Sequence, residues 1–142
     1  MKKTILSLML VSSSIFAIEG KTMTVYKSPY CGCCEKWIDI MKKEGFKIKT
    51  IDTNEVNDIK QKAGLQAGQT SCHTAFVDGY VVEGHVNYSA IKKMLQEKPD
   101  ILGISVPGMP IGSPGMEQDN IKQAYNIIYI NKDGTEGVYE SH

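Results

Sequence analysis

The sequence predicts an α/β protein whose elements run in the order β-α-β-α-β-β-α. Segments with the two-residue alternation of strands take turns with segments of helical periodicity, and two apolar runs flank Asp78-Gly79, a strong hairpin signal. At 142 residues the chain has the usual length of one domain. The crossover rules then favour a parallel sheet with one antiparallel hairpin and with helices on both faces.

The N-terminal segment, residues 1–20, has the pattern of a secretory signal peptide. Lys2 and Lys3 form a charged start, and a run of apolar and small residues from Thr4 to Ala17 follows. The alternative is an N-terminal membrane anchor, but this run is shorter than the ~20 apolar residues that span a bilayer. We therefore expect residues 1–20 to be removed on export, leaving residues 21–142 in the periplasm without stable membrane insertion.

Four elements are predicted before the hairpin: a strand at 22–27, a helix from Cys33 to Gly45, a strand at 46–52, and a short helix from Asn54 or Asn57 to Ala63. Both strands alternate apolar and polar residues. In the first helix, Trp37, Ile40 and Met41 recur at the i, i+3, i+4 spacing of a buried face.

The rest of the chain is expected to form strands at 74–77 and 80–83, a helix from Ser89 to Glu97, a loop at 103–117, and strands at Asn126–Ile130 and near Val138-Tyr139. The loop contains three prolines and four glycines, which is typical of stiff turns. The overall order, with cysteines at the junction of the first strand and first helix, is the layout of a thioredoxin or glutaredoxin core. The sequence therefore predicts a thioredoxin-like core with a Gly/Pro/Met-rich loop and a C-terminal strand extension.

Composition argues against a nucleic-acid-binding protein. The formal net charge is zero, and all 16 basic residues are lysines. Nucleic-acid-binding domains normally show a basic patch in which arginine makes bidentate contacts, so we expect no nucleic-acid partner.

Three cysteines lie within four positions, at Cys31, Cys33 and Cys34. They fall near the start of a predicted helix, where free backbone N–H groups and the helix dipole favour thiolates. Cys31 and Cys34 alone fit a redox dithiol, whereas a thiolate cluster that includes Cys33 fits a metal site. Two structural disulfides are a poor interpretation, because the adjacent Cys33 and Cys34 pair only with strain.

A fourth cysteine, Cys72, precedes the third predicted strand and is followed by His73. In the thioredoxin layout this loop faces the cysteine motif, and thioredoxins carry a cis-proline there. His85 follows the hairpin, which is expected to bring it to the same end of the sheet. Structural roles remain as alternatives, because a lone histidine is more often a satisfied structural residue and His73 also fits a core position that orients Cys72.

Met109 and Met116 lie beside glycine and proline in the 103–117 loop. A methionine usually fills a core, but these two have little apolar company. A thioether is a soft, neutral ligand that suits Cu(I). Thiolates, imidazoles and thioethers in an exported protein together indicate copper.

Three stretches, YKSPYCGCCEKW, SCHTAFVDGYVVEGHV and VPGMPIGSPGME, closely resemble the CopG-like copper-resistance proteins, a family long catalogued as a domain of unknown function. The resemblance extends from about Met23 to Tyr139. It implies a periplasmic, thioredoxin-like protein that binds copper. Asn87 stands where members of the family commonly have proline, and asparagine can cap a helix instead.

The resemblance also implies a ligand set. The family's metal-binding cysteines fall on Cys31, Cys33, Cys34 and Cys72, and its accompanying positions fall on His73, His85, Met109 and Met116. More than one Cu(I) ion is expected, because four thiolates in one place share several soft ions. The family is associated with changing the oxidation state of copper, which would make the protein a copper oxidoreductase. A chaperone or store that exchanges copper with other periplasmic copper-handling proteins fits the same residues.

Two other functions fit parts of the pattern. A thiol–disulfide oxidoreductase would use Cys31 as the nucleophile and Cys34 as the resolving thiol. The missing cis-proline, the additional cysteines and the methionine loop argue against it. A structural zinc site would need four cysteine or histidine ligands and no methionine.

Overall fold

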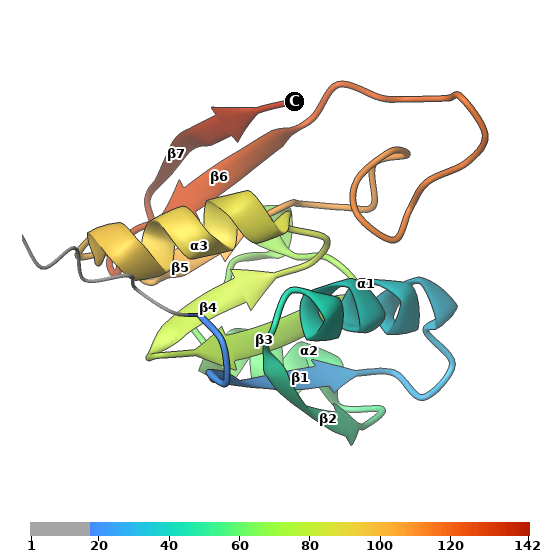
Figure 1. Cartoon of the computed structure of the whole chain (residues 1–142). Helices are drawn as coiled ribbons and strands as arrows, with labels where there is room; N and C mark the ends of the chain where they lie inside the picture. The colour runs from blue at the N-terminus through green and yellow to red at the C-terminus, as the bar shows by residue number, and fades with distance from the viewer. Residues whose placement is uncertain (1–17) are drawn as a thin grey trace, which may run out of the picture.

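The computed structural model describes residues 18–142, so most of the predicted signal peptide lies outside the described residues and stays a prediction. The elements in this part of the chain are β1 (Thr22–Lys27), α1 (Gly32–Lys43), β2 (Lys47–Asp52), α2 (Val56–Lys62), η1 (Ala67–Gln69), β3 (His73–Val77), β4 (Tyr80–Glu83), α3 (Tyr88–Glu97), β5 (Gly103–Ser105), β6 (Asn126–Ile130) and β7 (Glu136–Ser141) (Figure 1). Over the same residues, no helix combines the length and apolar character that a bilayer crossing requires.

The seven strands of residues 18–142 form one sheet in the order β2-β1-β3-β4-β5-β6-β7. β1 with β2 and β4 with β5 are parallel pairs, and the other four neighbouring pairs are antiparallel. The expectation of a parallel sheet with one antiparallel hairpin is therefore wrong. The difference arises because the β3–β4 hairpin lies in the middle of the sheet, where β3 runs against β1, and because β6 and β7 add a second hairpin.

The strand β5 lies inside the segment that was predicted as a loop. Its three residues pair with β4 on one side and β6 on the other, so they join the C-terminal strands to the rest of the sheet. A Cβ atom on Gly103 would lie 1.9 Å from the Val81 carbonyl oxygen, so this close approach requires glycine. Three residues are too few for a recognisable alternation, which is why the glycine-rich composition suggested a loop instead.

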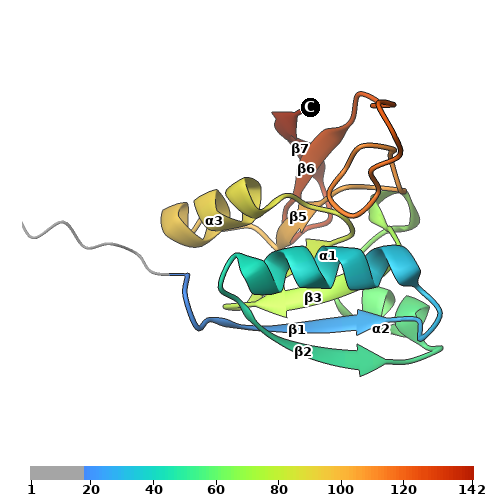
Figure 2. The same ribbon diagram turned by 45° about the vertical axis from the view of Figure 1, so that its right-hand side comes forward.

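Helices cover both faces of the sheet, as predicted. Figures 1 and 2 show α1 and α3 on one face and α2 on the other. Trp37 and Met94, from α1 and α3, belong to the larger core together with Val82. The neighbouring Val81 points to the opposite face, where it packs with Leu65 in a smaller apolar cluster.

The turns and caps follow the predicted chemistry at most positions. Asp78 and Gly79 have φ angles of 47° and 83°, and positive values at both residues are what a type I′ hairpin turn requires. The predicted start of the second helix at Asn54 or Asn57, either of which could cap it, is wrong, because α2 begins at Val56 with Glu55 in the N-cap position. The Glu55 N–H instead donates to the hydroxyl of Thr53 at 3.0 Å, which fixes the start of this short helix from the preceding turn.

Asn87 caps α3, since its Oδ1 accepts a hydrogen bond from the Ala90 N–H at 2.8 Å. Replacing Asn87 by alanine removes this acceptor and is expected to lower the free energy of unfolding by about 1 kcal/mol. Asn87→Asp keeps an acceptor oxygen at the helix N-terminus and is expected to retain most of the stability. Urea denaturation measures both variants, and equal losses in the two would contradict the capping role.

Candidate metal centre

The sheet register brings the two cysteine motifs to one end of the molecule. β1 and β3 are antiparallel neighbours in which Lys27 pairs with His73, so the end of β1 lies beside the start of β3. The CGCC motif at residues 31–34 follows β1 at the start of α1, and Cys72 directly precedes β3. Segments that are far apart in sequence therefore meet at this edge of the sheet.

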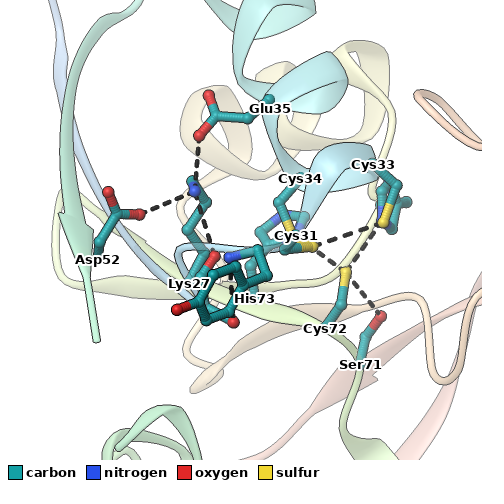
Figure 3. The surroundings of a disulfide bond; sticks show 12 residues. Lys27, Cys31, Cys33, Cys34, Glu35, Asp52, Ser71, Cys72 and His73 are labelled. Carbon is teal, nitrogen blue, oxygen red and sulfur yellow. Dashed lines mark hydrogen bonds and ion pairs between the residues drawn. A yellow bond between two sulfur atoms is a disulfide. The ribbon is translucent and has the colours of Figure 1, made fainter. Parts of the chain in front are cut away.

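The four cysteine sulfurs form one cluster (Figure 3). The Sγ atoms of Cys31, Cys33, Cys34 and Cys72 all lie within 4.8 Å of one another. Cys31 and Cys34 are joined by a disulfide, with Cα atoms 5.3 Å apart, and Cys33 Sγ lies 3.5 Å from Cys31 Sγ. Cys33 and Cys72 are free thiols. All four sulfurs become available as thiolates only after the disulfide is reduced.

Both predicted histidines lie beside Cys72. Its Sγ is 3.3 Å from Nδ1 of His73 and 3.0 Å from Nε2 of His85. The two side chains are fully buried, and the His73 ring packs against Trp37 with centroids 4.4 Å apart. Nδ1 of His85 lies 2.7 Å from the Pro114 carbonyl oxygen. Cys72 and the two histidines thus form a second potential ligand group, which shares one sulfur with the first.

Burial keeps Cys72 and the two imidazoles uncharged at neutral pH. Burial, together with the neighbouring Cys33 sulfur, raises the pKa of the Cys72 thiol to about 12. Burial lowers the pKa of His73 well below its ordinary value, and the nearby His85 and Lys60 lower it further. Burial also lowers the pKa of His85, although the Pro114 carbonyl opposes this change. A metal ion bound here would displace a proton from Cys72, whereas the neutral rings offer lone pairs directly.

The Gly/Pro/Met-rich loop lies next to this cluster, beside the N-terminal end of α1 in both ribbon views (Figures 1 and 2). The Gly108 N–H donates to the Thr70 carbonyl at 3.0 Å, and Ser71 Oγ donates to the Gly108 carbonyl. A Cβ atom on Gly115 would lie 3.0 Å from the Cys33 carbonyl oxygen. The loop backbone therefore touches both cysteine motifs.

Met109 and Met116 each follow one of these two glycines in sequence. The Met109 side chain is 52% exposed, and Met116 is half-buried. Both thioethers therefore belong to segments that are anchored beside the cysteines, and their role as ligands stays a prediction.

A buried ion pair supports the loop that carries Cys72. Glu83 is fully buried, and its Oε1 accepts hydrogen bonds from Lys60 Nζ at 2.6 Å and from the Ser71 N–H at 2.7 Å. Its Oε2 accepts from the Thr74 hydroxyl at 2.7 Å, and Lys60 Nζ also donates to that hydroxyl at 2.9 Å. The carboxylate thus holds the backbone immediately before Cys72 from the α2 face of the sheet.

The sequence interpretation missed the pair of Lys60 and Glu83. Glu83 ends an apolar strand, and Lys60 follows Val56 by one helical turn on the buried side of α2. A charged residue at a position where the periodicity predicts a buried side chain is the signal that would have found them, because such groups need a partner.

A second buried lysine lies close to the CGCC motif (Figure 3). Lys27 is 1% exposed, and its Nζ forms ion pairs with Glu35 at 2.6 Å and with Asp52 at 2.8 Å. Burial lowers the pKa of this amine, but hydrogen bonds and charge from the two carboxylates outweigh it, so the pKa is raised. These contacts tie the first turn of α1 to the ends of β1 and β2.

The donor set fits a soft metal ion. The cluster offers sulfur and imidazole nitrogen, and the ligand groups found among residues 18–142 around it contain no carboxylate. One buried nitrogen, Nε2 of His73, has no hydrogen-bond partner. Thiolates and imidazoles suit Cu(I) and Zn(II), and a thioether ligand beside them would favour copper.

The chain matches a protein-family model and solved protein structures. A family model described as "Protein of unknown function, DUF411" matches residues 69–116, which include Cys72, both of its histidine neighbours and both loop methionines. No curated protein matches the chain.

Two solved structures of the copper resistance protein CopG, called Form 2 and Form 1, match with TM-scores of 0.83 and 0.82. Both are 36% identical to this chain and cover 87% of it, and the matches extend over 99% and 98% of their own chains. The likeness therefore spans essentially the whole of those proteins.

Replacing Lys60 by methionine would leave the Glu83 carboxylate buried without its cation. Loss of one partner of a buried ion pair costs about 3–5 kcal/mol, so the free energy of unfolding of the metal-free protein is expected to fall by that amount. Guanidinium denaturation measures the change. Lys62→Met, at an exposed position of the same helix, is the control and is expected to shift stability by less than about 0.5 kcal/mol. Equal, small effects of the two substitutions would show that the pair contributes little.

Proposed function

The chain belongs to the family of the copper resistance protein CopG, as its three sequence motifs predicted, and we propose that it is a periplasmic protein of copper resistance that binds Cu(I). The observation that carries the proposal is the cluster of four cysteine sulfurs within 4.8 Å of one another. Thiolates are soft ligands, and one thiolate can bridge two ions, so Cys31, Cys33, Cys34 and Cys72 are proposed to hold more than one Cu(I).

Imidazole and thioether ligands are proposed to complete the coordination at the edge of the cluster. His73 and His85 support this role because their rings are neutral and lie within 3.3 Å of the Cys72 sulfur. Met109 and Met116 support it because their loop is hydrogen-bonded to the turn that precedes Cys72.

The compartment and the class of the core belong to the same proposal. The charged start and apolar run of residues 1–20 support export to the periplasm. The strand order β2-β1-β3-β4, with α1 directly after the first strand, supports a thioredoxin-like core. β5, β6 and β7 then form the C-terminal extension.

The Cys31–Cys34 disulfide gives copper binding a redox requirement. Reduction of the disulfide takes up two electrons and two protons and yields two thiols, so the reduced chain offers four sulfur ligands and the oxidised chain offers two. In the reverse direction, the dithiol can give two electrons to two Cu(II) ions, forming the disulfide, two Cu(I) ions and two protons. This is the proposed chemistry by which the protein changes the oxidation state of copper. If the protein does not change the oxidation state of copper, its proposed role is to transfer bound Cu(I) to other periplasmic copper-handling proteins.

The disulfide itself favours a second candidate function, a thiol–disulfide oxidoreductase. Cys31 is the N-cap residue of α1 and is partly exposed, whereas Cys34 is fully buried. An accessible first cysteine and a buried second cysteine fit the nucleophilic and resolving thiols of such an enzyme. This function would have no use for Cys33, Cys72 or the methionine loop.

Anaerobic titration of the reduced protein, residues 21–142, with Cu(I) against a competing chelator is expected to give more than one tightly bound ion per chain. Cys33→Ser is expected to weaken binding by more than about tenfold, because it removes one of the four proposed thiolate ligands, and loss even of a group behind a ligand commonly costs tenfold or more. Met109→Leu is expected to weaken binding to a lesser degree, and Met94→Leu in the core is its matched control. Absence of tight Cu(I) binding would refute the proposal, and a single zinc ion that resists Cu(I) would favour a structural zinc site.

A disulfide-reductase assay separates the two candidate functions. We expect the reduced protein to reduce insulin at close to the uncatalysed rate, and Cys31→Ser to leave that rate unchanged. Fast reduction that needs Cys31 and Cys34 but not Cys33 or Cys72 would favour the oxidoreductase instead. The assay is run without metal, so that copper chemistry does not contribute.

A further inference from the structure

We propose that residues 28–32, here called the docking turn, form the binding surface for a protein dithiol that reduces the Cys31–Cys34 disulfide. This partner would supply the electrons that the chain passes to copper. The inference rests on the proposed function and goes beyond it, because it identifies the electron donor by its chemistry: a protein with two neighbouring thiols.

The stoichiometry of the proposed copper reaction requires such a donor. Oxidation of the Cys31–Cys34 dithiol by two Cu(II) ions gives two Cu(I) ions and leaves the chain with the disulfide that the structure contains. A second cycle requires that a donor outside the chain return two electrons and two protons. A thiol reduces a disulfide by direct attack of its thiolate on one of the two sulfurs, so the donor must reach one of them.

Cys31 is the sulfur that a partner can reach. It is partly exposed, whereas Cys34 is 0% exposed. Attack on Cys31 makes Cys34 the leaving group. Cys34 is the third residue of α1, and the free backbone N–H groups and the dipole of a first helical turn stabilise a thiolate. Access and leaving-group stability therefore favour the same attack.

The Gly/Pro/Met-rich loop covers the other side of the cluster. The Gly108 N–H donates to the Thr70 carbonyl at 3.0 Å, close to Cys72 in sequence. A Cβ atom on Gly115 would lie 3.0 Å from the Cys33 carbonyl oxygen, so the loop backbone also lies against the start of α1. A partner that approaches the disulfide therefore meets the docking turn rather than the turn before Cys72.

The docking turn is open and has a fixed shape. The connection between β1 and α1 lies at the outer end of the molecule in Figures 1 and 2. Tyr30 is 91% exposed, and a Cβ atom on Gly32 would meet no other segment of residues 18–142 within 4 Å. The N–H groups of Cys31 and Tyr30 donate to the carbonyl and the hydroxyl of Ser28, at 3.1 and 3.3 Å.

The side chains of the docking turn suit a protein better than a small thiol. The stretch SPYCGCC contains no lysine, aspartate or glutamate, and protein interfaces are depleted of charge at their centre and enriched in tyrosine. Tyr30 directly precedes the cysteine that is attacked, so a partner that covers its ring also places a thiolate near Cys31. A small thiol such as glutathione is not large enough to bury that ring and gains little from it.

The electron transfer then takes two steps. A thiolate of the partner attacks Cys31 Sγ, which forms a mixed disulfide and breaks the Cys31–Cys34 bond, whose electron pair goes to Cys34. The second thiolate of the partner attacks the partner's own sulfur in the mixed disulfide, and that electron pair goes to Cys31. The partner leaves as a disulfide, and Cys31 and Cys34 take up the two protons that its thiols released.

The mixed disulfide provides the first test. The probe is reduced thioredoxin in which the second active-site cysteine is replaced by serine, so that it cannot complete the second step. Mixed with the oxidised, metal-free protein and followed by alkylation of the remaining thiols, it is expected to give a one-to-one adduct. Peptide mass spectrometry is expected to map the link to Cys31. A link to any other cysteine, or no adduct, would overturn the inference.

The exposed tyrosine provides the second test, in which reduction is followed by the number of thiols that can be alkylated, from two to four. Tyr30→Ser is expected to slow reduction by thioredoxin at least about tenfold, as loss of an interface anchor commonly does. Reduction by dithiothreitol, which needs no docking surface, is expected to change by less than about twofold. Val138→Ser removes a 58% exposed side chain from β7 and is the matched control, with both rates unchanged.

Two results of this assay would overturn the inference: an unchanged thioredoxin rate in Tyr30→Ser, or a wild-type rate with thioredoxin no faster than with glutathione at equal thiol concentration. Both assays are free of copper, so they are independent of the Cu(I) titration. If Cu(I) does not bind but both assays give the expected results, the proposed function fails while the docking surface stands. If Cu(I) binds tightly and the assays fail, only this inference is overturned.

Discussion

The buried carboxylate of Glu83 connects the parts of the chain that build the site. Its oxygens accept hydrogen bonds from Lys60 on α2 and from the backbone of Ser71, and its main-chain carbonyl accepts from the Val106 N–H at 3.0 Å. One residue at the end of β4 therefore joins a helix, the turn before Cys72 and the start of the methionine loop. Loss of any partner of this buried carboxylate would leave a charge or a polar group unpaired and would cost free energy. The position of the turn before Cys72 is therefore coupled to the sheet.

Pairing of buried charges also keeps the surroundings of the cluster close to neutral. Lys60 and Lys27 are both buried, and both have carboxylate partners within 3 Å. The sulfur of Cys72 and the rings beside it are uncharged in the absence of metal. A cation that bound here would displace the Cys72 proton to solvent, and its positive charge would compensate the negative charge of the thiolate.

Much of the fold follows from local patterns in the sequence. The alternation in β1, the Asp78-Gly79 turn and the Asn87 cap each depend on a few neighbouring residues, so each is recognisable without tertiary information. β5 is not, because a strand of three residues exists only through its two neighbours in the sheet. The mixed strand directions were missed for a similar reason, because the pairing of β3 with β1 depends on contacts between segments that are far apart in the sequence.

The residues of the candidate site likewise fall into those that local sequence patterns predict and those that only the folded chain brings together. The cysteines and histidines were recognisable because their chemistry is rare and their motifs lie at predicted element ends. The Cys31–Cys34 disulfide was foreseen only as one alternative, because the spacing suits both a redox pair and a thiolate cluster. Lys60 and Glu83 lie 23 positions apart on different elements, so only the folded chain shows that they meet.

The short strand β5 has a consequence for the loop that begins after it. β5 and β6 are antiparallel neighbours, so the loop at 106–125 leaves the sheet and returns to it at adjacent strands. Its ends cannot move apart, and hydrogen bonds at Gly108 and Pro114 hold two further points against the site. Because the loop is tethered in this way, its thioethers have a high effective concentration near the cysteines, on the order of millimolar for short flexible links. A thioether on a separate molecule would have to be present at that concentration to compete. Any approach of the methionine side chains to the cysteines would therefore be intramolecular and would cost little additional chain entropy.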